Sequence, residues 1–127
     1  MRIGYDANPM VGDLGGVGWH SYHLLRTMLA QQEGIDFVAY ARPGADQPDS
    51  VGAWPGVERL QWVNSSRWGM AKRGSSDRLD LYHGTNFRMQ TVGRYGGVVT
   101  IHDLWLDRHP EYSKKMLGQW PSSFKTR

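Results

Sequence analysis

Apolar and polar positions follow two different periods along the chain, and each period predicts a kind of element. Short apolar or alternating runs with the length of β-strands recur through the sequence. Val98–Ile101 is the clearest candidate for a buried strand. Neither alternating half of Val57–Val63 is cleanly apolar, which predicts an edge or partly exposed strand. The predicted strands are residues 1–6, 35–41, 57–63, 79–83 and 98–101.

One long segment has the helical period instead. A helix is predicted from Gly16 or Val17 to Gln31, and Gly34 is the expected C′ residue. At about 100° per residue, its apolar side chains form one broad stripe and its polar side chains the opposite one. The apolar stripe is Val17, Tyr22, Leu24, Leu25, Met28 and Leu29, and the polar side is His20, His23, Arg26, Thr27 and Gln31. Solvent-exposed histidines are therefore expected at His20 and His23, which lack an obvious third metal ligand.

The remaining segments are predicted mostly as connections. Residues 42–55 are rich in Gly, Pro, Asp and Ser and are expected to be a loop. Residues 64–78 are weakly patterned and predict a mobile crossover with a frayed helix. Pro110 is expected to open a helix over 111–119, with Pro121 as its stop.

This order of elements predicts an α/β fold: an open, mostly parallel Rossmann-like sheet with helices on both faces, formed by residues 1–127 as one domain. In such sheets ligands bind beyond the carboxyl ends of the strands. Three polar segments fall at predicted strand ends, and we expect them to share one site. They are Asp6 with the glycine-rich loop, the tip at residues 83–86, and His102-Asp103.

The glycine-rich loop Gly12–Gly18 joins the first predicted strand to the helix. Backbone N–H groups at a helix start attract anions, and glycine lets a phosphate approach closely. The spacing is neither that of a dinucleotide-binding fingerprint nor that of a Walker A loop. It fits a phosphate-facing loop and a tight connection without a ligand equally well.

Composition narrows the classes of function. The net charge of +3 and the pI near 9.4 come from scattered basic residues, and we find no nucleic-acid-binding motif. Cysteine is absent, so disulfides and thiolate metal sites are excluded. There is neither a signal peptide nor an apolar stretch long enough to span a membrane. A cytoplasmic protein is expected, and peripheral contact with an anionic membrane is compatible with the charge.

Three blocks of sequence resemble retaining GT-B glycosyltransferases of the group 1 type. They occur in the family's order and span nearly the whole chain. The first runs from Met1-Arg-Ile-Gly-Tyr-Asp-Ala-Asn-Pro through Gly15-Gly-Val-Gly-Trp-His-Ser-Tyr-His-Leu-Leu-Arg26. The second is Asp80-Leu-Tyr-His-Gly-Thr-Asn86, and the third is Val98-Val-Thr-Ile-His-Asp-Leu104 with His109-Pro-Glu-Tyr112.

The resemblance implies roles for individual residues. The loop Gly15, Gly16, Val17 and Gly18 would approach the donor diphosphate. His102 would lie beside the transferred sugar as a catalytic residue, with Asp103 supporting it. The acceptor side would be lined by His83, Thr85, Asn86 and Trp19, although Trp19 replaces the basic residue usual after Gly-Gly-Val-Gly. The substrates would be a nucleotide-sugar and a sugar or lipid acceptor, with no metal and no other cofactor.

The resemblance also implies a second, donor-binding domain with a Glu-x7-Glu motif, which these 127 residues lack. One expectation is therefore an amino-terminal fragment of a glycosyltransferase that is inactive alone. The alternative is a non-catalytic binding or assembly module that forms a homodimer through the incomplete sheet, because an exposed sheet edge favours pairing.

Overall fold

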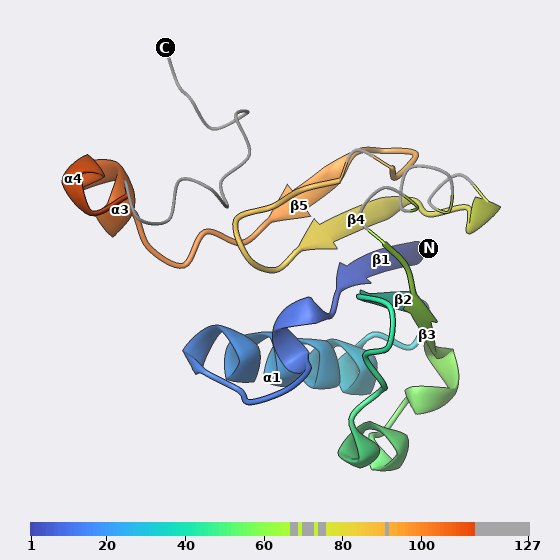
Figure 1. The fold of residues 1–127 in the computed structure, drawn as a ribbon. Coiled ribbons are helices and arrows are strands. Elements are labelled where there is room, and N and C mark those ends of the chain that lie inside the picture. Colours follow the sequence, from blue (N-terminus) through green and yellow to red (C-terminus); the bar gives the residue numbers. More distant parts are fainter. Residues whose placement is uncertain (67–68, 70–72, 74–75, 91, 114–127) are drawn as a thin grey trace.

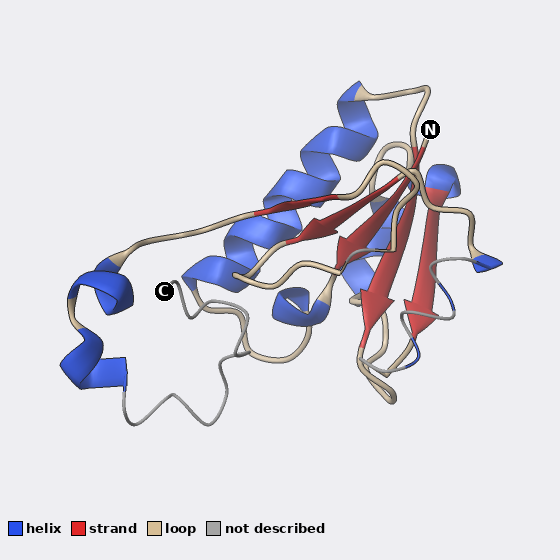
Figure 2. Cartoon of the chain, turned by 90° about the horizontal axis from the view of Figure 1, so that it is seen from above, coloured by secondary structure: helices blue, strands red, loops and turns tan. Residues whose placement is uncertain are grey.

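The chain folds around one parallel β-sheet. A computed structural model describes all residues except 67–68, 70–72, 74–75, 91 and 114–127. The five strands lie in the order β3-β2-β1-β4-β5, and every neighbouring pair is parallel. Figures 1 and 2 show the twisted sheet with its strands side by side. The strands are β1 (Arg2–Asp6), β2 (Asp36–Ala41), β3 (Leu60–Asn64), β4 (Leu81–Gly84) and β5 (Gly97–Val99).

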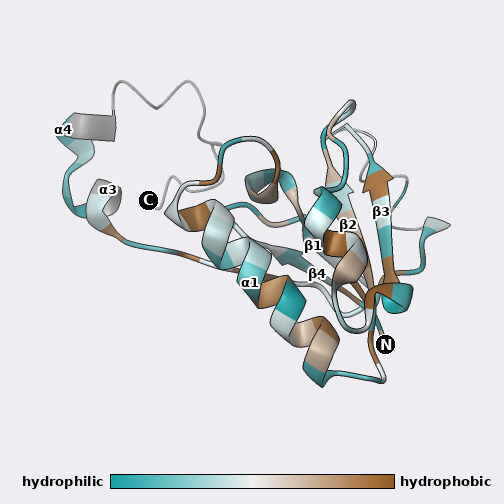
Figure 3. Cartoon of the chain, turned by 90° about the horizontal axis from the view of Figure 1, so that it is seen from below, coloured by the Kyte–Doolittle hydropathy of each residue, from teal (hydrophilic) through white to brown (hydrophobic). Residues whose placement is uncertain are grey.

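One long helix covers one face of this sheet. Helix α1 (Gly16–Gln31) lies along the sheet, as Figure 3 shows from below. Its buried Leu25 and Leu29 pack into a cluster with Tyr5 and Phe37 from the first two strands. The parallel α/β architecture predicted from the sequence is thereby confirmed. The expectation of helices on both faces depends partly on the crossover at 64–78, which lies partly outside the described residues.

The opposite face has a smaller apolar cluster. Side chains alternate between the two faces of a strand, so Val38 and Tyr40 point away from α1. They pack with Val63, Leu79 and Tyr82, all of them buried, and with the partly buried Val92. The Tyr40 hydroxyl donates a hydrogen bond to Asp77 Oδ2 at 2.5 Å.

Short helices replace part of what the sequence predicted as loop or strand. The segment 42–55 contains the 3₁₀ helix η2 (Asp49–Ala53), so the prediction of a plain loop was wrong. Val51 and Trp54 explain the difference, because both are buried in the α1-side cluster. A further 3₁₀ turn, η3 (Val57–Arg59), precedes β3, which lies at the sheet edge as predicted. The turn η1 (Asn8–Met10) follows β1.

The strand near residue 98 forms, but it is not buried. Val98 is 53% exposed, and Ile101 is similarly open. The strand β5 has three residues and lies at the other edge of the described sheet, and none of its three residues is fully buried. The chain then runs away from the sheet to two single turns, α3 (Trp105–Arg108) and α4 (Pro110–Ser113), visible apart from the sheet in Figure 1. Pro110 begins α4 as predicted, and residues 114–119 of the predicted helix lie outside the described part.

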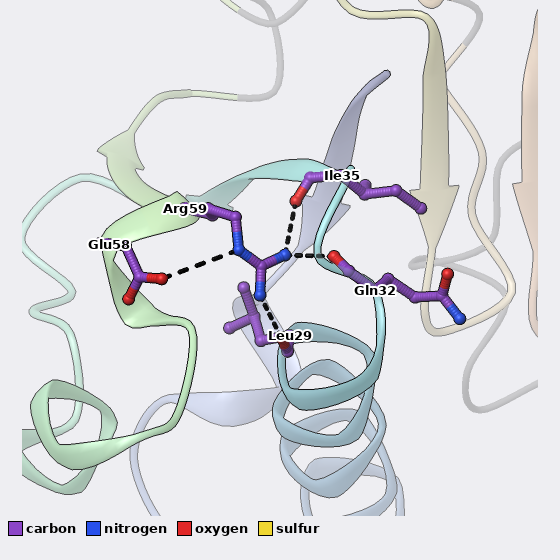
Figure 4. A network of polar contacts seen from close by, with 5 residues as sticks. All are labelled: Leu29, Gln32, Ile35, Glu58 and Arg59. Atoms are coloured by element: carbon purple, nitrogen blue, oxygen red, sulfur yellow. Dashed lines mark hydrogen bonds and ion pairs between the residues drawn. The ribbon is translucent and has the colours of Figure 1, made fainter.

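The carboxyl end of α1 is closed by an arginine from η3. The Arg59 guanidinium donates hydrogen bonds to the carbonyl oxygens of Leu29 and Gln32, and to that of Ile35 at 3.0 Å (Figure 4). The helix ends at Gln31 with Gln32 as its C-cap, and Gly34 does not adopt a left-handed conformation, so the predicted glycine cap was wrong. The guanidinium satisfies the last carbonyls in its place.

Candidate functional site

The three predicted site segments meet at one end of the sheet. The chain passes from β1 to β2 and β3 on one side and returns to β4 on the other side, so β1 is the topological switch point. The Thr85 hydroxyl donates to the Asp6 carbonyl oxygen at 2.7 Å. His102 Nε2 lies 2.8 Å from the Thr85 carbonyl oxygen. These two bonds join the ends of β1, β4 and the segment after β5.

The loop that follows β4 folds back tightly over the strand end. A Cβ added at Gly84 would lie 1.5 Å from the Arg88 carbonyl oxygen, so only glycine fits there. Phe87 has a φ of 57°, which is uncommon for an aromatic residue. Its N–H donates to the Thr100 carbonyl oxygen at 3.1 Å, and the Thr100 N–H donates to Gly84 at 2.8 Å. The loop is thus anchored to the segment that carries His102.

Three histidine rings gather on the α1 side of this end. The His20 and His102 ring centroids are 5.2 Å apart with nearly perpendicular planes. His83 lies on the same face of the sheet as Tyr5, its strand partner, and their rings meet edge to face at 5.3 Å. His83 Nε2 lies 2.8 Å from the Thr100 hydroxyl. Burial, and secondly the nearby His20 charge, lower the pKa of His83, which favours the neutral form of this ring.

Asp6 ends β1 on the other side of the same rim. Its register partner is Tyr40, which places its side chain on the face away from α1. Burial raises the pKa of the Asp6 carboxyl, while hydrogen bonds from Asn8 and the Arg88 charge act in the opposite direction. The polar groups at this rim therefore divide into a histidine group and a carboxylate group, with Thr85 between them.

The glycines of the predicted diphosphate loop have two different surroundings. A Cβ at Gly15 or Gly16 would meet nothing within 4 Å, and neither side chain position is covered. A Cβ at Gly18 would lie 2.5 Å from the Pro9 carbonyl oxygen, so this glycine lets α1 pack against η1. Gly15 is the N-cap of α1 and offers no side-chain cap, while Val17 is partly buried in the first turn. Open space around the glycine Cα atoms is thus found at Gly15 and Gly16, not at Gly18.

The other predicted site residues differ in how close they come to the histidines. Thr85 is fully buried beneath the exposed groups of the site. Asn86 is exposed next to it. Asp103 Oδ1 accepts the Trp105 N–H at 3.0 Å, which begins the turn α3.

Trp19 lies with a separate aromatic group. Its ring stacks on His23 at 5.7 Å and meets Tyr22 edge to face at 5.6 Å. Tyr22 in turn contacts Trp54, so this row of rings leads toward η2. The ring contacts of Trp19 are therefore made within α1, whereas His83 contacts the Tyr5 ring and the Thr100 hydroxyl.

His20 is the residue of this cluster that the sequence pattern missed. Its helical position put it on the polar side of α1, where solvent exposure was expected. It is exposed, yet the segment carrying His102 passes beside it. Phe87, whose ring lies 5.8 Å from that of His102, was also missed. In the sequence, the one signal of a tight loop before Phe87 was the turn residue Gly84, two positions after Tyr82.

Within the described ranges, no group of three or more His, Asp or Glu side chains is arranged to hold a metal ion. In the same part of the chain, no helix is long and apolar enough to cross a membrane. Comparison with family models, with curated proteins and with solved structures found no match for this chain.

Proposed function

We propose that this chain is the amino-terminal, acceptor-side part of a retaining GT-B glycosyltransferase of the group 1 type. The observation that carries the proposal is the meeting of three family-like segments at the switch point of a parallel sheet. A Rossmann-like sheet alone supports many functions, so the fold adds little without this convergence. A cytoplasmic location belongs to the same proposal.

In this proposal, the open start of α1 receives part of the donor diphosphate. The first N–H groups of a helix have no acceptor within the helix, and the helix dipole favours negative charge there. During transfer the bond from the sugar anomeric carbon to the diphosphate oxygen breaks. A bond from the acceptor oxygen forms, and the departing oxygen takes the acceptor proton. Backbone N–H groups at Gly16 and Val17 would stabilise the charge that develops on the leaving group.

His102 would hold a hydroxyl of the transferred sugar. A carbonyl oxygen only accepts hydrogen bonds, so the short contact with Thr85 places a proton on His102 Nε2. In the neutral ring, Nδ1 then carries the lone pair and accepts a hydrogen bond. This assignment gives His102 a role in binding and orienting the sugar. The resemblance places the basic residues that neutralise the diphosphate in a second domain.

Amide chemical-shift mapping tests this proposal. We expect UDP-glucose or GDP-mannose to shift the amides of Gly15, Gly16 and His102 together, and His102→Ala to weaken the effect. His109→Ala, an exposed histidine beside Glu111, is the matched control and should change nothing. No sugar transfer by these 127 residues alone is expected. The proposal would be contradicted if these amides shifted with neither nucleotide-sugar and with none of a panel of neutral disaccharides. Shifts confined to other surfaces would also contradict it.

An assembly module is the second candidate, and one observation favours it. Four large apolar side chains on the segment from β5 to α3 are about half exposed: Val98, Ile101, Leu104 and Trp105. Within the described sheet, β5 is hydrogen-bonded to β4 on one side only. A second copy of the chain pairing there would cover both the edge and these side chains. Sedimentation velocity should then give a concentration-dependent dimer that Val98→Lys abolishes, and a monomer at all concentrations would exclude this candidate.

A further inference from the structure

The histidine cluster contains a residue that no motif assigns. His20 comes from the second turn of α1, and it contacts the ring of His102, which is 82 positions later in the chain. It also lies near enough to His83 for its charge to lower the pKa of that ring. Two independent neighbours thus place His20 inside the cluster.

The ring of His102 is held at three points. Its Nε2–H donates to the Thr85 carbonyl oxygen, and Thr85 is itself fixed by its hydroxyl bond to Asp6. The centroid of the Phe87 ring, on the loop after β4, lies 5.8 Å from that of His102. The centroid of the His20 ring, on α1, lies 5.2 Å from it. Phe87 keeps its place through an uncommon positive φ, an arrangement that tends to occur where the surrounding structure requires it.

One hydrogen bond does not fix an imidazole. The ring can still turn about the line of that bond, or flip so that the other nitrogen faces the carbonyl. Edge-to-face contacts from two neighbouring rings restrict that freedom, because a rotated His102 ring would collide with them. His20 supplies such a contact from α1, the element whose start carries the open glycines.

We propose that His20 is a positioning residue: its ring holds the His102 ring in the Nε2–H tautomer, with Nδ1 turned to the ligand. The importance of that orientation for sugar binding rests on the proposed function, but the positioning itself does not. Among the described residues, no set of three His, Asp or Glu side chains is arranged to hold a metal ion.

Three variants separate ring contact from the other properties of His20. His20→Ala removes the ring, and His20→Phe restores a flat ring without its nitrogens. His23→Ala is the matched control, an exposed histidine three residues further along α1 whose ring contacts lie with Trp19 and Tyr22. Thermal unfolding of all three establishes that each is folded.

Long-range ¹H–¹⁵N correlation spectra of the imidazole rings, recorded on the free chain above pH 7.5, report the tautomer directly. We expect one Nε2–H signature for His102 in the parent chain, its loss to a tautomer mixture in His20→Ala, and its return in His20→Phe. His23→Ala should match the parent. An unchanged signature in His20→Ala would overturn the proposal, and so would a mixture that His20→Phe fails to restore.

A second measurement keeps this proposal separate from the proposed function. UDP-glucose binding should weaken in His20→Ala and recover in His20→Phe if both proposals hold. If the parent chain binds no nucleotide-sugar while the ring spectra behave as expected, the proposed function fails and the positioning role stands.

Discussion

The two ends of helix α1 are built in opposite ways. At the carboxyl end, Arg59 reaches across from η3 and donates to three carbonyl oxygens, with only 16% of its side chain exposed. At the amino end, Gly15 provides no side-chain cap, and a Cβ at Gly15 or Gly16 would meet nothing. One end is closed by a side chain of the protein itself, whereas the other has no side-chain cap. The contrast separates an end whose contacts stabilise the fold from the end at which the proposed function places the ligand.

The largest expected effect comes from opening the closed end. Arg59→Ala leaves the carbonyls of Leu29, Gln32 and Ile35 without their donor, and charge-assisted hydrogen bonds contribute strongly. We expect the free energy of unfolding to fall by about 2–4 kcal/mol in urea denaturation. Glu58→Ala is the control: its carboxylate is 3.9 Å from Arg59 and largely exposed, so a change below about 0.5 kcal/mol is expected. Equal losses in the two variants would disprove the closed-end interpretation.

The next effect distinguishes two glycines of the open end. Gly18→Ala forces a Cβ against the Pro9 carbonyl oxygen and should destabilise by about 1–3 kcal/mol. Gly16→Ala has open space and helical geometry, so it should stabilise by about 0.5–1 kcal/mol. Urea denaturation of both variants measures the difference. If Gly16→Ala also weakens nucleotide-sugar binding, the substitution that stabilises the fold hinders the approach of the ligand. Destabilisation by Gly16→Ala would refute the description of this end as open.

A smaller effect concerns the carboxylate at the end of β1. Burial raises the Asp6 pKa above its usual 3.8, so the folded state holds the proton more tightly than the unfolded state. Stability from this group is present below pH 3.8 and is lost as the pH rises through the folded pKa. Asp6→Asn keeps an oxygen that accepts from Asn8 and should be more stable than the parent at pH 7.

The matched control for that variant is Asp13→Asn, in the exposed part of the glycine-rich loop. Chemical denaturation at pH 7 and near pH 4 should show the advantage of Asp6→Asn shrinking toward acid, while Asp13→Asn shows no such trend. A loss of stability at pH 7 on Asp6→Asn would mean that the carboxylate is held by favourable contacts instead.

The smallest effect is the titration of His83. Its pKa is lowered, so the stability that it contributes is complete above the usual value of 6.5 and is lost as the pH falls through the folded pKa. His20→Phe removes the second cause and should raise the His83 pKa only part of the way back, because burial remains the larger cause. NMR titration of the His83 ring measures this, with His23→Phe as the control. An unmoved pKa would show that His20 acts on His102 alone.

Local pattern was sufficient for the main elements of this fold. The start of the helix was predicted to within one residue of Gly16. The edge position of the strand near Trp62 was also predicted, although this strand begins at Leu60 and not at Val57. Both predictions rest on periodicity, which indicates which side chains a neighbouring element can cover. The pattern was wrong about burial near Val98, since composition does not reveal whether a strand has neighbours on both sides. The burial of Trp54 was not predicted for a related reason, because a turn-rich segment can still place a large side chain in the core.

The site was predicted in its location and only partly in its members. Strand ends in a parallel sheet must gather at one rim, so His83 and His102 could be placed together from topology. His20 could not, because a position on a helix says which side it faces and not which distant segment crosses it. Arg59 was missed likewise: nothing in its local sequence indicates that its guanidinium reaches the end of another helix.

The short edge strand β5 is expected to open before the rest of the sheet. It has three residues and few covering side chains, while β1 and β2 are paired on both sides. Sub-global opening in native-state hydrogen exchange should therefore begin at β5, with the β1–β2 centre protected until complete unfolding. Since the segment after β5 carries His102, such opening would withdraw that ring and dismantle the histidine cluster while the rest of the sheet stays intact.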